Sequence, residues 1–126
     1  MTHSVLVVDD EKMTRDLLRM MLRSAGFEVF EAGNGLETLQ KLNEQRPDVV
    51  VLDVMMPEMD GLSACIEIRK NPQTADLPVI MLSAKTHGTA VREGIDAGAN
   101  LYLTKPIARK KLIEAINSLI NDKEPA

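Results

Sequence analysis

The most informative stretch of this sequence is Val49-Val-Val-Leu-Asp53, in which four consecutive apolar residues lead directly into a carboxylate. A run this short, rich in valine and without alternation of apolar and polar residues, is typical of a strand buried on both faces of a parallel sheet. Two further runs have the same form, Val5–Val8 and Val79–Leu82, and weaker ones lie at Glu28–Glu31 and Leu101–Leu103. Five strands are therefore predicted.

Apolar residues at helical spacing lie between and after these runs. The stripes are Met13, Leu17, Met20 and Met21; Leu36, Leu39 and Leu42; Ile66 with Arg69, after Asp60-Gly61; Val91 and Ile95; and Leu112, Ile116 and Leu119. Asn34 and Glu37 have the spacing of a capping box, and Gly26 and Gly98 stand where helix C-caps are expected. Because strand–helix–strand crossovers are right-handed, five such units predict an α/β fold, a parallel sheet with helices on both faces.

Length and composition narrow the class of protein. The chain of 126 residues suits a single domain, 1–126, in which 121–126 is expected to be a tail or the start of a linker. A net charge of −4 and only three aromatic residues, Phe27, Phe30 and Tyr102, argue against direct contact with nucleic acid. The single Cys65 excludes an intramolecular disulfide, and no apolar run approaches the roughly 20 residues of a membrane span. We therefore expect a cytoplasmic protein without membrane insertion.

Polar side chains follow the predicted strands at the point where each ends. Asp9 and Asp10 follow the first strand, Asp53 the third, Ser83 the fourth and Lys105 the fifth. In an open parallel sheet, ligands bind beyond the carboxyl ends of the strands, so these side chains are expected to share one site.

The charges at this edge indicate a metal site. Asp9, Asp10 and Asp53 bring −3 and Lys105 brings +1, which leaves −2 without compensation. Oxygen ligands with no nearby His or Cys favour a hard divalent cation, Mg²⁺ with Mn²⁺ as the alternative. With that ion bound, the Asp53 carboxylate could attack a phosphoryl group, while Lys105 and Ser83 bind phosphate oxygens.

Four motifs spread through the chain resemble the receiver domain of two-component response regulators, the family that includes the chemotaxis regulator of flagellar motors. They are Val5-Leu-Val-Val-Asp-Asp10; Asp48-Val-Val-Val-Leu-Asp53-Val-Met-Met-Pro57-Glu-Met-Asp-Gly61; Pro78-Val-Ile-Met-Leu-Ser83-Ala84; and Gly98-Ala-Asn-Leu-Tyr102-Leu-Thr-Lys105-Pro106. The resemblance runs from Ser4 to Ile120. It implies one domain with flavodoxin-like strand order 2-1-3-4-5 and five flanking helices.

The resemblance also implies roles for the site residues. Asp53 would be the phosphorylated residue, and Asp9, Asp10 and the backbone carbonyl of Met55 would join it as metal ligands. Ser83 and Lys105 would contact the phosphoryl group, and the peptide bond before Pro106 would be cis. The phosphoryl donor would be a partner histidine kinase or histidine phosphotransfer protein, docking on the helix that carries Leu17, Met20 and Met21. The domain would be a phosphorelay signalling protein and not an enzyme, catalysing only its own phosphorylation and dephosphorylation.

In the family, a hydroxyl after the fourth strand is coupled to an aromatic residue on the fifth, and Ser83 and Tyr102 stand at these positions. The resemblance thus implies a switch that reshapes the face of the fourth helix, fifth strand and fifth helix. Met55 and Lys85 are expected to tune the lifetime of the phosphate. Because the Met55 side chain offers no group that orients a water, we predict slow autodephosphorylation.

The sequence does not identify the downstream target of the signal, and two other functions stay open at this point. The chain has no recognisable DNA-binding, cyclase or protease segment, so its output is a downstream protein or an output domain outside this sequence. Asn100, Leu101 and Lys111 depart from the charge pattern with which some regulators of the family pair. A Mg²⁺-dependent phosphohydrolase with an aspartyl nucleophile is the alternative function, although Met55 stands where its general acid would be. A flavodoxin-like electron carrier is disfavoured because Asp9-Asp10-Glu11 would repel a flavin phosphate.

Overall fold

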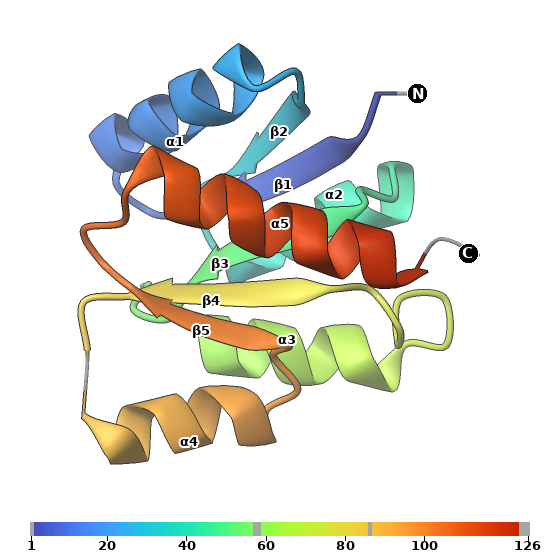
Figure 1. Cartoon of the computed structure of the whole chain (residues 1–126). Coiled ribbons are helices and arrows are strands. Elements are labelled where there is room, and N and C mark those ends of the chain that lie inside the picture. The colour runs from blue at the N-terminus through green and yellow to red at the C-terminus, as the bar shows by residue number, and fades with distance from the viewer. Residues whose placement is uncertain (1, 57–58, 86, 124–126) are drawn as a thin grey trace.

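The structure is a computed structural model of the whole chain, and its description covers residues 2–56, 59–85 and 87–123. Strands and helices alternate along the chain (Figure 1). In chain order they are β1 (Ser4–Val8), α1 (Lys12–Ser24), β2 (Glu28–Ala32), α2 (Gly35–Glu44), β3 (Val49–Asp53), α3 (Gly61–Lys70), β4 (Val79–Ser83), α4 (Gly88–Asp96), β5 (Leu101–Thr104) and α5 (Arg109–Lys123).

The five strands form one parallel sheet in the order β2-β1-β3-β4-β5, which confirms the predicted fold class. Figure 1 shows α1 and α5 on one face of the sheet and α2, α3 and α4 on the other. Alternate residues of the central strands enter the two apolar layers: Val5 and Val7 pack with α1 and α5, whereas Leu6 and Val8 pack with α3. Burial on both faces explains why these strands lack apolar–polar alternation.

Local signals in the sequence agree with the ends of several helices. The Asn34 side chain accepts a hydrogen bond of 2.8 Å from the backbone N–H of Glu37, as the first half of the predicted capping box requires. Gly26 and Gly98 adopt φ values of 93° and 115° just after α1 and α4, a left-handed conformation that favours glycine at helix ends.

The residues expected to form a tail or the start of a linker, 121–126, begin within the last helix. Helix α5 continues through Lys123, so residues 121–123 are helical, and 124–126 lie outside the described residues. Ile120, like Ile116 and Leu112, is buried on the face of α5 that packs against the sheet, which keeps the last turns of the helix in place. No helix in the described part of the chain combines the length and the apolar character needed to cross a membrane.

Candidate functional site

Parallel pairing brings the predicted site residues to one edge of the sheet. Asp53 is the last residue of β3 and Ser83 the last of β4, while Asp9 and Lys105 directly follow β1 and β5. The sequence analysis expected these side chains at the points where their strands end. Asp53 and Ser83 still pair within the sheet, Asp53 opposite Leu82 and Ser83 opposite Thr104.

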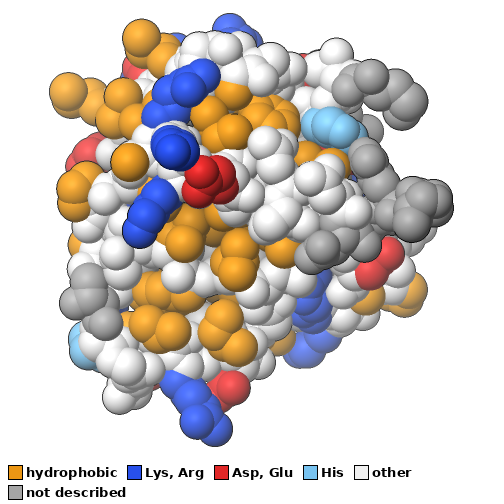
Figure 2. Space-filling model, in the orientation of Figure 1, with side chains coloured by type: hydrophobic (Ala, Val, Ile, Leu, Met, Phe, Trp, Pro, Cys, Tyr) orange, Lys and Arg blue, Asp and Glu red, His pale blue; other side chains and the backbone are white. Residues whose placement is uncertain are grey.

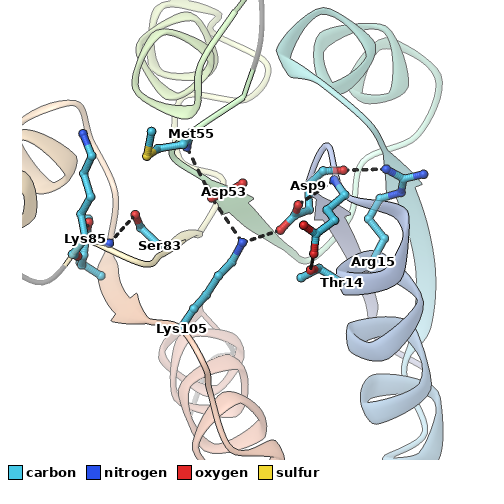
Figure 3. A network of polar contacts seen from close by, with 10 residues as sticks. Asp9, Thr14, Arg15, Asp53, Met55, Ser83, Lys85 and Lys105 are labelled. Carbon is cyan, nitrogen blue, oxygen red and sulfur yellow. Dashed lines mark hydrogen bonds and ion pairs between the residues drawn. The ribbon is translucent and has the colours of Figure 1, made fainter.

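Lys105 reaches across this edge to two carboxylates (Figure 3). Its Nζ lies 2.7 Å from Asp9 Oδ2, a hydrogen-bonded ion pair, and 3.5 Å from Asp53 Oδ1. The second carboxylate oxygen of Asp9 accepts a hydrogen bond of 2.9 Å from the backbone N–H of Glu11. Asp9 and Asp53 are both buried, so this charged cluster is held in place by direct contacts rather than by solvent.

Asp9, Asp10 and Asp53 each offer a carboxylate oxygen, and these three oxygens all lie within 4.8 Å of one another. Lys105 neutralises one of the three negative charges and leaves two. An all-oxygen donor set of this charge fits a hard divalent cation such as Mg²⁺, whose binding would cancel the remainder. Asp10 is exposed, which leaves the cluster open to solvent on one side.

The electrostatics of the cluster shift two pKa values. Burial, and next the negative charge of Asp9, raise the pKa of Asp53 from its ordinary value of 3.8 to about 6, although Lys105 and the Met55 N–H act in the opposite direction. Burial disfavours the charged form of Lys105, but its hydrogen bond to Asp9 and the charges of Asp53 and Asp9 outweigh burial and raise its pKa. Lys105 therefore stays cationic, and Asp53 carries an energetically costly charge at neutral pH.

Ser83 and Tyr102 are joined through one residue, Lys85. The fully buried Ser83 accepts a hydrogen bond of 3.1 Å at Oγ from the Lys85 N–H, and the Lys85 carbonyl accepts one of 2.9 Å from the Tyr102 hydroxyl. The Tyr102 ring packs over Gly94 of α4, where a Cβ would lie 2.7 Å from ring atom Cδ2. The structure thus connects the floor of the site to the ring that lies between β5 and α4.

Met55 and Lys85 both lie at the mouth of the site, on the side of Asp53 away from Asp9 (Figure 3). Met55 is 57% exposed, and its backbone N–H lies 3.4 Å from Asp53 Oδ1. Both residues line a cavity of about 540 Å³, together with His87 and Glu93 of the α4 region.

The Lys105–Pro106 peptide bond is cis, as the family resemblance implied. Pro57, part of the second motif, lies outside the described residues.

Gly61 is a residue of the site that reasoning from the sequence did not single out. It begins α3 directly after Asp60, whose side chain caps that helix by accepting from the Ser63 N–H at 2.8 Å. A Cβ at Gly61 would lie 2.1 Å from the backbone oxygen of Asp53, so α3 abuts the end of β3 without room for a side chain. The available signal was a glycine at the first position of a helix.

Asn100 and Leu101, which depart from the charge pattern with which some regulators of the family pair, differ from each other in their contacts. Asn100 is exposed, and its side-chain Oδ1 accepts hydrogen bonds from the Val79 N–H at 2.8 Å and from Arg69 Nη2 at 2.9 Å. Leu101 is half-buried on β5. Figure 2 shows hydrophobic side chains gathered over β5, with Lys and Arg side chains beside them. The surface over β5 therefore combines an apolar centre with charged side chains at its margin.

Comparisons with known proteins agree with this geometry. The model of the response regulator receiver domain family matches residues 5–117. Response regulator MprA of Mycobacterium leprae is 40% identical over 121 residues, which cover 96% of this chain and 52% of that protein. The chain therefore spans about half the length of the curated relatives it matches.

Two solved structures share the fold over nearly their whole length. A putative response regulator from Chloroflexus aurantiacus is 36% identical with a TM-score of 0.92, covering 96% of this chain and 99% of that one. The receiver domain of a sensor histidine kinase from Pseudomonas aeruginosa, with a magnesium ion coordinated in its active site cleft, is 30% identical with a TM-score of 0.90, covering 96% and 99%. Sequence match, strand order and acidic cluster agree: the chain belongs to the response regulator receiver domain family of two-component signalling systems.

Proposed function

We propose that Asp53 accepts a phosphoryl group from a phosphohistidine of a partner histidine kinase or phosphotransfer protein, and that the domain passes this signal on through the face of α4, β5 and α5. The observation that carries the proposal is the buried Asp53 carboxylate, which lies beside the acidic residues Asp9 and Asp10 and 3.5 Å from the ammonium group of Lys105. Met55 stands where a phosphohydrolase of this type would have its general acid, and its thioether has no proton to donate. The phosphohydrolase alternative therefore gains no support.

The site supplies the groups that phosphoryl transfer needs. Mg²⁺ held by Asp9, Asp10, Asp53 and the Met55 carbonyl would offset the negative charge of the incoming phosphoryl group. An Asp53 carboxylate oxygen attacks phosphorus, the P–N bond to histidine breaks, and its electron pair returns to the imidazole nitrogen, which takes up a proton. Lys105 binds one phosphoryl oxygen, and the Ser83 hydroxyl donates a hydrogen bond to another.

Ser83 is also the first member of the proposed switch. In the structure its Oγ accepts from the Lys85 N–H, and Lys85 in turn accepts from Tyr102. When the Ser83 hydroxyl turns toward the phosphoryl group, it gives up the contact with Lys85, and the Tyr102 ring repacks beside Gly94. A local charge is thereby converted into a change of the apolar surface at β5.

Helix α1 offers the surface on which the donor protein docks. Met13, Leu17 and Met20 are 81%, 53% and 65% exposed, an unusual amount of apolar surface on one helix next to the site. Docking there brings a donor histidine to the edge of the sheet that carries Asp9 and Asp10, since α1 begins at Lys12. The signal then passes to a downstream protein or to an output domain.

The proposal is tested by incubating the protein with Mg²⁺ and a radiolabelled small-molecule phosphoryl donor such as acetyl phosphate. We expect acid-stable, base-labile label on the wild type and none on Asp53→Asn. Asp96→Asn, which changes an exposed carboxylate on α4, serves as the matched control and is expected to label like the wild type. Equal labelling of the wild type and Asp53→Asn would overturn the assignment of Asp53.

Met55 is expected to make the phosphorylated state long-lived. Its exposed thioether carries no N–H or O–H group and cannot orient a water for attack on the acyl phosphate. We predict that Met55→Asn speeds loss of the phosphate by about tenfold, because the amide can hold a water in line with the bond. The measurement is decay of the label in Mg²⁺, with Met13→Asn on α1 as control. A wild-type half-life of a minute or less would contradict the prediction of slow dephosphorylation.

A further inference from the structure

Arg15 of α1 turns back along its helix toward the end of β1 (Figure 3). Its Nη1 donates a hydrogen bond of 2.7 Å to the backbone carbonyl oxygen of Asp9. Its Nε lies 3.4 Å from Glu31 Oε1 at the end of β2, and the Arg15 side chain is only 19% exposed. Arg15 is therefore held between two strands by one charged and one neutral partner.

The carbonyl that Arg15 binds has a special place in the chain. Strand β1 ends at Val8, so the carbonyl of Asp9 lies beyond the regular pairing of the strand. That carbonyl belongs to the peptide plane joining Asp9 to Asp10, and the orientation of this plane sets the direction in which the Asp10 side chain leaves the backbone. The other polar groups of Asp9 are already engaged, its N–H by Ala32 and its carboxylate by Glu11 and Lys105.

Asp10 depends on this backbone contact more than Asp9 does. In the residues that the structure describes, the exposed Asp10 carboxylate makes no hydrogen bond or ion pair, so no side chain orients it. Its oxygen nevertheless lies within 4.8 Å of those of Asp9 and Asp53. The backbone alone therefore holds Asp10 in the cluster, and Arg15 is the side chain that binds this segment of backbone.

We propose that Arg15 is a positioning residue for the cation site: it holds the Asp9–Asp10 peptide so that both carboxylates face Asp53. This inference rests on the proposed function, since it concerns the Mg²⁺ on which phosphorylation depends. Groups that hold a metal ligand in place commonly change metal affinity by about 10- to 100-fold when removed.

A purely electrostatic role for Arg15 predicts the opposite result. Removing its positive charge leaves Glu31 less compensated and makes the surroundings of the cluster more negative. A more negative site attracts a divalent cation more strongly, so loss of charge alone tightens Mg²⁺ binding. Loss of positioning weakens it. The sign of the change in affinity therefore separates the two roles.

The test is titration of the metal-free protein with Mg²⁺ in an isothermal calorimeter, which needs no phosphoryl donor. We expect Arg15→Met to weaken Mg²⁺ binding by about tenfold. Arg15→Lys retains the charge but not the forked guanidinium, and is expected to weaken binding by about threefold. Arg23→Met, which removes an exposed arginine from the last turn of the same helix, is expected to bind as the wild type does.

The outcomes are distinguishable from failure of the proposed function. If the wild type binds no Mg²⁺, the proposed function fails and the inference falls with it. If the wild type binds Mg²⁺ and Arg15→Met binds it equally or more tightly, only the role of Arg15 is overturned. Circular dichroism shows whether each variant is folded. Should Arg15→Met not fold, Arg15→Lys decides, and wild-type affinity in that variant overturns the inference.

Discussion

Asp53→Asn is expected to make the metal-free protein about 2 kcal/mol more stable than the wild type at pH 8, with little difference at pH 4. The reason is the cost of the buried charge, which raises the pKa of Asp53 from 3.8 to about 6. A shift of this size corresponds to about 3 kcal/mol, and solvent at the open side of the cluster reduces it to about 2 kcal/mol. Asparagine has nearly the same shape without the charge.

The direction of the pH dependence follows from where the proton binds more tightly. Because the pKa of Asp53 is higher in the folded state than in the unfolded chain, the folded state binds this proton more strongly. The wild type therefore loses stability relative to Asp53→Asn as pH rises from about 4 to about 6, and the difference stays constant above that range.

Urea unfolding in EDTA at pH 4, 6 and 8 measures this difference, with Asp96→Asn as the exposed control that should stay within about 0.5 kcal/mol of the wild type. Adding Mg²⁺ at pH 8 should stabilise the wild type more than Asp53→Asn, because the ion binds only the folded site. A wild type that is as stable as Asp53→Asn at pH 8 without metal would show that the Asp53 charge carries no cost.

Gly61→Ala is expected to lower the free energy of unfolding by about 3 kcal/mol, because the added Cβ has no space. It would lie 2.1 Å from the Asp53 carbonyl oxygen and 2.9 Å from both the Asp53 carbonyl carbon and Val54 Cα. All three atoms belong to the backbone at the end of β3 and cannot turn aside as a flexible side chain can. The junction of β3 and α3 must shift, and Asp53 shifts with it.

Gly88→Ala provides a closely matched control for this substitution. Gly88 is also the first residue of its helix, α4, but no atom of the described residues lies within 4 Å of the position where its Cβ would stand. Alanine there is expected to leave stability unchanged or to raise it by up to about 1 kcal/mol, as usual in helices. Urea unfolding compares the two variants, and phosphorylation of folded Gly61→Ala should be slower. Equal stability of both variants would contradict the close approach of α3 to Asp53.

Both predictions concern the same property of the site. Asp53 is buried at the end of a central strand, next to another buried carboxylate, in an arrangement that costs stability and that a bound cation would relieve. The apolar layers on both faces of the sheet offset this cost and keep the carboxylates in place. Under the proposed function, Mg²⁺ binding would relieve this repulsion between carboxylates, which the fold alone maintains.

Much of the fold could be read from local pattern. Valine-rich runs such as Val49–Leu52 predict buried parallel strands because burial on both faces leaves no place for polar residues. The grouping of Asp9, Asp53 and Lys105 was predictable as well. Parallel strands bring their carboxyl ends to one edge of the sheet, and these residues stand at strand ends in the sequence. The extension of α5 through Lys123 was not visible in the sequence, because the burial of Ile120 depends on a sheet formed by distant residues.

By itself, then, the sequence determined the five β–α units, the edge on which the site lies, and the charge that a cation would have to cancel. Only the tertiary structure decided how closely α3 approaches Asp53 at Gly61, that Arg15 reaches the carbonyl of Asp9, and that burial shifts the pKa of Asp53. The physical reason is the distance along the chain over which each effect acts. Hydrophobic pattern acts over neighbouring residues and shows in the sequence, whereas contacts of a few ångströms and the cost of a buried charge depend on how separate segments pack.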